Sequence, residues 1–170
     1  APVRLTGGRH RGRRIEAAPG HEVRPTAIRA RQALFNILAH SPKIGADPPL
    51  PEEAQVVDVF AGTGALGFEA LSRGARHVTF IDNDDAPLRV IKRNAAHLDE
   101  AERVTVLRRD ATAPGKAPAP CGLALLDPPY RSGLAAPALI AFEREGWLGP
   151  GAIAVVELAA NEAFQPPQGF

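Results

Sequence analysis

The sequence predicts an α/β protein with a Rossmann-like, doubly wound and mostly parallel sheet. Five short apolar segments show little alternation of polar and apolar side chains, at residues 55–60, 77–81, 104–107, 122–126 and 152–158. Such segments are typical of strands that are buried on both faces of a parallel sheet. Helical patterns lie between them at residues 65–73, 85–98 and 134–145. Strands that alternate with helices in this way predict helices on both faces of the sheet.

A small extension precedes the predicted sheet. Residues 3–5 and 14–16 alternate polar and apolar side chains around glycine turns, which predicts a β-hairpin. A helix is expected to begin at Arg24-Pro25-Thr26, with Thr26 as its N-cap. Helical spacing places Arg29, Arg31 and Gln32 off an apolar face formed by Ala30, Ala33, Leu34, Ile37 and Leu38. Four prolines between residues 41 and 54 predict a linker, so we expect an extension of residues 1–43 and a main domain of residues 55–170.

The composition is that of an ordinary globular domain. The chain has 170 residues, of which 45% are hydrophobic and 23% charged, enough for one domain with a sizeable core. No apolar run approaches the roughly 20 residues of a membrane span, and the basic N-terminus lacks the apolar part of a signal peptide. We therefore expect a cytoplasmic protein without membrane contact. The single Cys121 excludes an intramolecular disulfide, and the five histidines have no zinc-binding spacing, so no metal is expected.

Charge is distributed unevenly along the chain. Residues 1–43 contain nine Lys and Arg against two acids, a formal charge of +7, whereas the remainder carries −6. A basic front on an acidic domain favours binding to a polyanion such as a nucleic acid. The alternative from charge alone is a solvated arginine-rich tail.

A glycine-rich loop follows the first predicted strand of the main domain. Gly62-x-Gly64-x-x-Gly67 lets the backbone approach a ligand at the carboxyl end of the strand. With Asp82 following 20 residues after Gly62, the loop also fits a nicotinamide dinucleotide site. Asp58 lies inside the strand, where a dehydrogenase is normally apolar, and its carboxylate suits an amino-acid-like ligand with an ammonium group. The loop alone leaves S-adenosyl-L-methionine and a nicotinamide cofactor both open.

Acidic residues stand at the ends of successive strands. Asp82 is placed to accept hydrogen bonds from ribose hydroxyls, and Asp110 to accept one from an adenine amino group. Each acid alone could be a helix cap or a surface residue, but three acids at three strand ends favour a cofactor site. The candidate cofactor-binding residues are Asp58, Phe60, Ala61, Gly62, Gly64, Asp82, Asn83, Asp110 and Ala111.

The segment Asp127-Pro128-Pro129-Tyr130 follows the apolar strand at residues 122–126 and is the candidate catalytic site. The lone pair of an exocyclic base amine is delocalised into the ring, so hydrogen-bond acceptors beside it are needed to aim that lone pair at a methyl sulfonium. The Asp127 carboxylate and the Pro128 carbonyl can supply these acceptors, and the two prolines make the turn rigid. Tyr130 offers an aromatic face for a base removed from its stack. This chemistry requires neither a metal nor a covalent intermediate.

The chain resembles the RsmD family of bacterial 16S ribosomal RNA guanine-N2 methyltransferases along nearly its whole length. The N-terminal segments Gly7-Gly8-x-x-Arg11-Gly12-Arg13 and Arg24-Pro25-Thr26 carry the more specific part of the resemblance, together with Leu34-Phe35-Asn36. Many amino-methyltransferases share the glycine loop and the Asp-Pro-Pro motif.

The resemblance implies a class I methyltransferase fold and methyl transfer from S-adenosyl-L-methionine to the N2 amine of a guanine. The expected substrate is 16S rRNA in the 30S subunit or a late assembly intermediate, and the protein is expected to be a monomer. The resemblance also implies RNA contacts from the hairpin and its helix, at Arg9, Arg11, Arg13, Arg14, Arg24, Thr26, Arg29 and Arg31.

Two departures from the family pattern are visible. Ile28 and Gln32 stand where the family usually has Asp and Glu. Family members also finish with an antiparallel strand pair after the strand matching residues 152–158, whereas this sequence ends at Phe170. We therefore expect a C-terminal strand pair to be missing and the edge of the sheet to be exposed.

Three other functions compete with this interpretation. A DNA adenine or cytosine amino-methyltransferase would share the Asp-Pro-Pro-Tyr chemistry, but it usually needs an additional target-recognition segment. A non-catalytic RNA-binding or ribosome-assembly factor on a methyltransferase fold is the second alternative. A nicotinamide oxidoreductase is the third, and no candidate hydride-transfer acid or base supports it.

Overall fold

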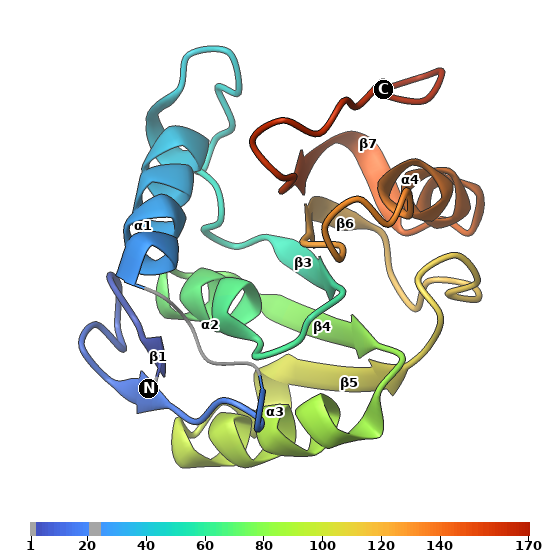
Figure 1. The fold of residues 1–170 in the computed structure, drawn as a ribbon. Helices are drawn as coiled ribbons and strands as arrows, with labels where there is room; N and C mark the ends of the chain where they lie inside the picture. Colours follow the sequence, from blue (N-terminus) through green and yellow to red (C-terminus); the bar gives the residue numbers. More distant parts are fainter. Residues whose placement is uncertain (1–2, 21–24) are drawn as a thin grey trace.

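The protein, seen here in a computed structural model, is built on a five-stranded parallel sheet with the order β5-β4-β3-β6-β7. The structure describes residues 3–20 and 25–170, with the backbone alone for Pro25 and Thr26. The strands are β3 (Gln55–Val59), β4 (His77–Asp82), β5 (Val104–Arg108), β6 (Cys121–Leu126) and β7 (Leu148–Val156). The helices are α1 (Pro25–His40), α2 (Ala65–Ser72), α3 (Asp85–His97) and α4 (Ala135–Arg144), with a 3-10 turn, η1, at Ala101–Arg103. This arrangement confirms the predicted α/β fold (Figure 1).

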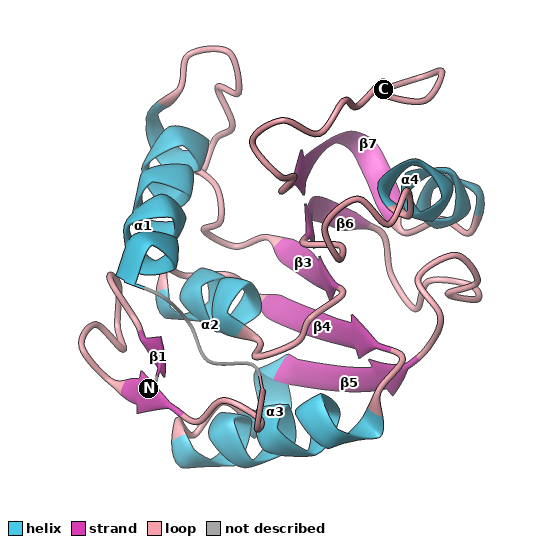
Figure 2. Cartoon of the chain, viewed as in Figure 1, coloured by secondary structure: helices cyan, strands magenta, loops and turns pink. Residues whose placement is uncertain are grey.

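Two hydrophobic clusters cover the two faces of the sheet. On one face, side chains such as Phe80 and Leu123 pack with Phe68 of α2 and Ile91 of α3. On the opposite face, the cluster includes sheet residues such as Val57 and Leu126 and the α4 residues Ala138, Leu139 and Phe142. Figure 2 shows α4 beside β6 and β7, away from the group formed by α1, α2 and α3.

The N-terminal hairpin consists of β1 (Val3–Arg4) and β2 (Arg14–Ile15), which pair antiparallel as predicted. Val3, Leu5 and Ile15 are buried in the same cluster as α2 and α3. Phe35 and Leu38 of α1 belong to that cluster too. The hairpin and α1 therefore share the core of the main domain.

The predicted apolar face of α1 is wrong in part. Ala30, Ala33 and Ile37 are exposed, and 57% of the Ile37 surface is accessible to solvent. Arg31 is buried instead, on the same side as Phe35 and Leu38. The helix turns this face inward because Arg31 forms an ion pair with buried Glu69 of α2, a partner that helical spacing alone does not reveal. The helix also begins at Pro25, so Thr26 lies inside it rather than at the N-cap.

The last strand differs most from its predicted bounds. β7 begins at Leu148, four residues before the predicted start, and ends at Val156, two residues before the predicted end. It includes Gly149-Pro150-Gly151 and meets β6 across a register shift between Cys121 and Leu123. At such an irregularity a strand can contain glycine and proline, residues that sequence patterns associate with turns and not with strands. β7 lies at the edge of the sheet, and the described residues 157–170 contain no further helix or strand.

None of the described helices combines the length and the apolar character that crossing a membrane requires.

Candidate functional site

The centre of the sheet contains the switch point where an open α/β sheet places its ligands. From β3 the chain proceeds outward through β4 and β5, and then returns to β6 on the other side of β3. The crevice at the carboxyl ends of β3 and β6 is therefore the expected binding place. Val59 pairs with both Ile81 and Leu126, and Leu126 pairs with Val156. The residues that follow these positions, namely Phe60, Asp82, Asp127 and Glu157, thus leave the sheet at one level, which we call the carboxyl edge.

The glycine loop turns away from β3 through left-handed backbone conformations. Phe60, Gly62 and Gly64 have φ values of 60°, 53° and 79°. A positive φ is costly for residues other than glycine, so Phe60 is a strained position of the kind that clusters at binding sites. The Gly62 amide donates a hydrogen bond of 2.9 Å to the Asp82 carboxylate. The loop and Asp82 are therefore joined directly.

Gly67 brings α2 close to the sheet. A Cβ atom added there would lie 2.3 Å from Phe80 Cε1, so no larger residue fits without displacing that ring. The Gly67 amide donates a 2.9 Å hydrogen bond to Asp58 Oδ2. Asp58 is buried inside β3 beneath the loop, as its place in the sequence predicts. Burial, chiefly, raises the pKa of this carboxyl well above its ordinary value, and the charges of Asp127, Asp82 and Glu157 act in the same direction.

The remaining predicted cofactor residues follow β4 and β5. Asp82 Oδ1 accepts a hydrogen bond from the Asp84 amide, which shapes the turn around exposed Asn83. Asp110 lies two residues beyond β5, and hydrogen bonds from the Thr112 hydroxyl and amide lower its pKa. Ala111 is buried in the cluster on the α4 face. These residues stand at the same edge of the sheet as the glycine loop, at and just beyond the ends of β4 and β5.

The Asp-Pro-Pro-Tyr segment begins directly after β6. The Asp127 amide lies 3.4 Å from the Val59 carbonyl oxygen, so the segment starts beside the end of β3. Pro128 is buried, whereas Pro129 is exposed and 71% of the Tyr130 surface is accessible. An aromatic ring this exposed is available for stacking. The four predicted catalytic residues thus lie beside the candidate cofactor loop.

Glu157 belongs to this edge, although the sequence interpretation omitted it. Its amide donates a 2.9 Å hydrogen bond to the Leu126 carbonyl oxygen, which places it next to Asp127. Burial raises the pKa of Glu157, and the charge and hydrogen bonding of Asp127 raise it further. Desolvation by the surrounding protein also raises the pKa of Asp127, although the residue is partly accessible to solvent. The available signal was an acid directly after an apolar strand, but Glu157 was assigned to the strand itself.

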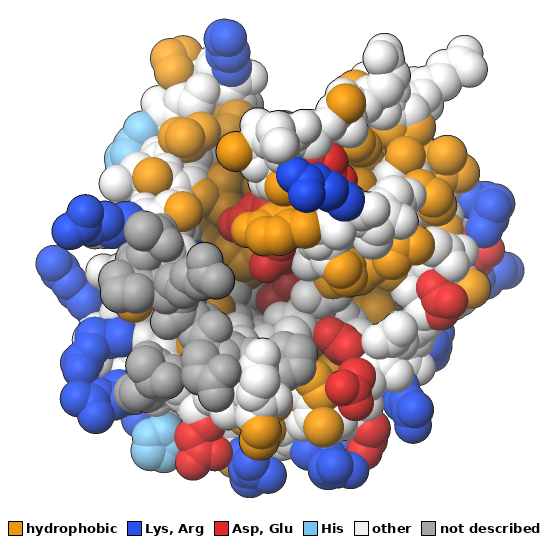
Figure 3. All heavy atoms as spheres, viewed as in Figure 1, with side chains coloured by type: hydrophobic (Ala, Val, Ile, Leu, Met, Phe, Trp, Pro, Cys, Tyr) orange, Lys and Arg blue, Asp and Glu red, His pale blue; other side chains and the backbone are white. Residues whose placement is uncertain are grey.

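Basic side chains lie toward the periphery of the face that holds this acidic centre. Figure 3 shows acidic side chains in a hollow near the middle of the face and further ones at lower right, whereas Lys and Arg side chains lie mainly along the outer edge. Of the predicted RNA contacts, five are exposed: Arg9, Arg11, Arg13, Arg14 and Arg29. Arg24 and the side chain of Thr26 lie outside the described residues. The five exposed arginines come from the hairpin and α1, which form one side of the molecule in Figure 1.

Arg31 is a correction to the predicted RNA contacts. Only 3% of its surface is exposed, and its Nε donates a 3.0 Å hydrogen bond to Glu69 Oε1. Its guanidinium also donates to the Arg4 carbonyl oxygen. Because these partners occupy the guanidinium inside the protein, Arg31 joins α1 to the hairpin and α2 and does not belong to the exposed basic surface.

Glu69 is the common partner that holds the extension in place. It accepts hydrogen bonds from the Thr6 amide and hydroxyl, the Gly7 amide, Arg31 and Arg73. Its burial would raise its pKa, but the hydrogen bonds from Arg73, Thr6 and Arg31 outweigh this effect and lower it. The loop of the hairpin is therefore fixed to the middle of α2, the helix whose first turn follows the glycine loop.

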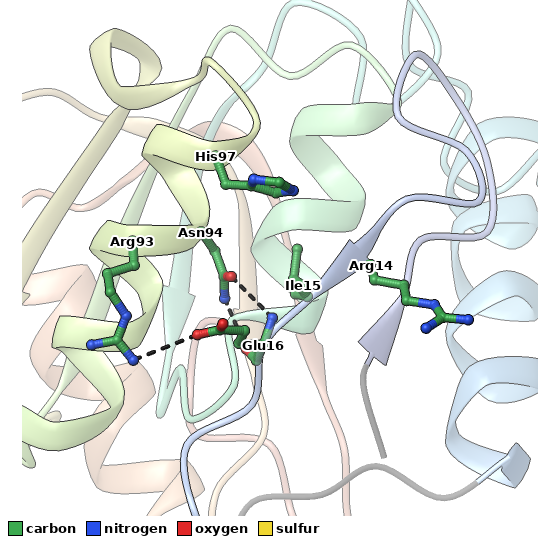
Figure 4. A pocket seen from close by; sticks show the side chains of 6 residues that line it. All are labelled: Arg14, Ile15, Glu16, Arg93, Asn94 and His97. Atoms are coloured by element: carbon green, nitrogen blue, oxygen red, sulfur yellow. Dashed lines mark hydrogen bonds and ion pairs between the residues drawn. The ribbon is translucent and has the colours of Figure 1, made fainter.

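A second set of contacts fixes the hairpin to α3. Asn94 accepts a 3.0 Å hydrogen bond from the Glu16 amide and donates a 2.8 Å bond to the Glu16 carbonyl oxygen. Figure 4 shows this pair at the base of a shallow pocket of about 350 Å³, with Arg93 and Arg14 pointing away from each other. The pocket lies at the C-terminal end of α3, away from the carboxyl edge, and its arginines do not converge on a common point. It is therefore an anchoring contact of the hairpin and not a second ligand site.

The part of the chain that the structure describes contains no group of three or more His, Cys, Asp or Glu side chains arranged to hold a metal ion.

Comparison with known proteins identifies relatives along the whole chain. A family described as conserved hypothetical protein 95 matches residues 3–170. The Ribosomal RNA small subunit methyltransferase D of Escherichia coli K12 is 36% identical over 155 residues, which cover 91% of this chain and 74% of that protein. The protein of the same name from Haemophilus influenzae is 31% identical over 172 residues, which cover 99% of this chain and 84% of the relative.

Solved structures show the same architecture. The Escherichia coli protein yhhF superimposes with a TM-score of 0.77 at 36% identity, over 97% of this chain and 86% of that one. A structure from Haemophilus influenzae gives a TM-score of 0.76 at 29% identity, over 98% of this chain and 87% of the other. The fold described above is therefore shared along the length of both relatives.

Proposed function

Since this chain belongs to the RsmD family, we propose that it is an S-adenosyl-L-methionine-dependent methyltransferase acting on the exocyclic N2 amine of a guanine in 16S rRNA. Relatives at 31–36% identity are named as methyltransferases of small-subunit ribosomal RNA, which supports the RNA substrate. The structural support is the shared level of the glycine loop after β3 and the Asp-Pro-Pro-Tyr segment after β6. This single observation carries the proposal, because methyl transfer needs a methyl donor and an amine acceptor side by side.

The residues of the carboxyl edge fit the proposed cofactor. Gly62 and Gly64 have left-handed backbone conformations, and glycine at such positions lets the backbone come close to a ligand. Asp82 would accept hydrogen bonds from the ribose hydroxyls in place of the Gly62 amide it now binds. Asp58 would lie near the amino-acid part, where an ammonium group would favour its ionised form. When bound, the cofactor supplies an electrophilic methyl group on a sulfonium centre.

Asp127 and Pro128 then orient the amine. Its two N–H groups donate to the Asp127 carboxylate and the Pro128 carbonyl oxygen, which directs the nitrogen lone pair toward the methyl group. Asp127 would be placed to accept, directly or through water, the proton that the amine loses on receiving the methyl group. The raised pKa of Asp127 makes it a stronger base than an ordinary aspartate. Rate enhancement comes from positioning of the reactants and exclusion of water.

The basic surface supplies the substrate side of the proposal. Exposed arginines on the hairpin and α1 suit a phosphate backbone. Tyr130 provides a stacking surface for a base that has left its helix. We further propose that the substrate is the 30S subunit or a late assembly precursor, that the protein acts as a monomer, and that it works in the cytoplasm.

Methyl transfer to defined substrates tests the proposal. The protein is incubated with labelled S-adenosyl-L-methionine and 30S particles purified from a strain that lacks this gene, with duplex DNA in a parallel reaction. We expect label in 16S rRNA, and N2-methylguanine after hydrolysis to nucleosides. Label in DNA alone, or on adenine or cytosine, would contradict the proposal. Wild-type 30S particles serve as the control, since their target is already methylated.

A further inference from the structure

Glu157 occupies a position at the carboxyl edge that no predicted role explains. It is the first residue after β7. Its amide donates a hydrogen bond to the carbonyl oxygen of Leu126, the residue that precedes Asp127. Register pairing between Leu126 and Val156 brings the two following carboxyl groups out of adjacent parallel strands at one level. Adjacent strands are about 4.8 Å apart, so the side chains that follow them are immediate neighbours.

We infer that Glu157 is a positioning residue for methyl transfer, whose carboxyl group hydrogen-bonds to that of Asp127 and fixes its orientation. This role rests on the proposed function, in which Asp127 accepts a hydrogen bond from the amine. A carboxylate before a proline turn can still rotate about its side-chain bonds, and a hydrogen bond from a neighbour removes that freedom. In the inferred arrangement Glu157 donates the hydrogen bond and Asp127 accepts it.

The charges around Glu157 favour this arrangement. Asp127 beyond β6 disfavours its ionised form, and Arg31 of α1 partly offsets that effect. The charge of Glu157 also raises the pKa of Asp58 in β3. Desolvation raises the pKa of both Glu157 and Asp127. Hydrogen bonding between the two groups raises the pKa of Glu157 further and lowers that of Asp127.

The pairing has a consequence for the pH dependence of the reaction. As pH rises through the raised pKa of Glu157, the shared proton leaves and two like charges face each other. The hydrogen bond that orients Asp127 is then lost, so kcat is expected to fall as pH rises through the Glu157 pKa. An amide in place of Glu157 would keep a donor toward Asp127 at every pH.

The pair itself can be tested without any activity assay. The side-chain carboxyl carbons are titrated by NMR in the wild-type protein and in Asp127→Asn. This substitution removes the neighbouring negative charge, so the pKa of Glu157 is expected to fall toward its ordinary value. Glu145→Gln, at the end of α4, is the control and should leave the titration of Glu157 unchanged. An identical Glu157 titration in all three proteins would overturn the inference.

Two further variants test the positioning role. Glu157→Gln should retain kcat and lose the fall of kcat with rising pH. Glu157→Ala should reduce kcat by about 10-fold to 100-fold, the range found when outer hydrogen-bonding partners of metal ligands are removed. Its KM for S-adenosyl-L-methionine should change little. Equal loss in both variants, or the same fall of kcat with rising pH in Glu157→Gln as in wild type, would overturn the role.

The two proposals fail in different ways. A wild-type protein that methylates no RNA refutes the proposed function and with it the positioning role, whatever the NMR titration shows. Active wild-type protein with an unshifted Glu157 titration refutes the inference alone.

Discussion

Glu69 in α2 and Asp58 in β3 are both almost fully buried carboxyl groups, 0% and 1% exposed, yet their surroundings are opposite. Glu69 is enclosed by two arginines, a hydroxyl and backbone amides, and its pKa is lowered. Asp58 has one backbone hydrogen bond and three other acids nearby, and its pKa is raised. The first arrangement compensates the buried charge, whereas the second leaves it largely uncompensated.

This difference separates a region built for stability from one suited to a ligand. A buried carboxylate with matched donors strengthens the fold around it, since removing either partner leaves a buried charge unpaired. Carboxyl groups that face each other cost folding free energy, and such strain is typical of functional sites. The contacts of Glu69 therefore hold the hairpin and its exposed arginines in place. The carboxyl edge, in contrast, presents acidic groups that a ligand can bind.

The largest expected effect is on the stability of the hairpin side. Glu69→Gln leaves Arg31 buried without its counter-charge, so the free energy of unfolding should fall by about 3–5 kcal/mol. Urea denaturation at pH 7 measures this. Glu53→Gln breaks the exposed pair with Arg76 and should cost less than about 1 kcal/mol. Equal effects of the two substitutions would contradict the structural role of Glu69.

The lowered pKa of Glu69 also fixes the sign of its pH dependence. Its contribution is fully present above the unfolded pKa of about 4.3 and is lost as pH falls through the lower folded value. Wild type should therefore lose stability on acidification more steeply than Glu69→Gln. Parallel curves for the two proteins would contradict this assignment.

At the carboxyl edge, a large effect is expected on activity rather than on stability. Asp127→Ala removes an acceptor of the reacting amine, so methyl transfer should fall by about 100-fold or more, as for other groups aimed at a transition state. Binding of S-adenosyl-L-methionine, measured by calorimetry, should stay within a few-fold. Glu143→Ala on α4 is the matched control and should leave both quantities unchanged. A large loss of cofactor affinity in Asp127→Ala would refute its role toward the base.

An intermediate effect is expected on RNA association. Substitution of Arg11 and Arg13 together by Gln should weaken binding to 30S particles and lower the slope of log K against log salt by about 2, one for each phosphate contact. Arg144→Gln, on the opposite side of the sheet, removes a positive charge outside the hairpin and should leave the slope unchanged. An unchanged slope would show that the hairpin arginines are only a solvated surface.

The smallest expected effect is a gain in stability at Asp58. Its raised pKa means that stability falls as pH rises from the unfolded value of about 3.9 through the folded value, and the cost persists above it. Asp58→Asn keeps an acceptor for the Gly67 amide and removes this cost, so the free energy of unfolding at pH 7 should rise by about 0.5–2 kcal/mol. Urea denaturation at pH 4 and pH 7 should show a weaker pH dependence than wild type. A clear loss of stability at pH 7 would contradict the comparison.

Most elements of the fold were predictable because their signals are local. The apolar segments of β3, β4 and β6 and the glycine after α2 mark their elements within a few residues. The glycine loop and Asp127-Pro128-Pro129-Tyr130 were predicted for the same reason, since each motif follows its own strand. The predicted bounds of β7 were less accurate, because the first residues of the strand include Gly149-Pro150-Gly151 at an irregularity in its pairing with β6.

Sequence alone determined the α/β class, the loop, the Asp-Pro-Pro-Tyr segment and the basic front, because each depends on neighbouring residues. Only the tertiary structure decided that Arg31 is an internal ion pair, and that Glu69 joins the hairpin to α2 across more than 60 residues. It likewise decided that Glu157 stands beside Asp127. Burial and charge pairing are properties of groups that meet through folding, so the same arginine or glutamate has one role at the surface and another inside the core.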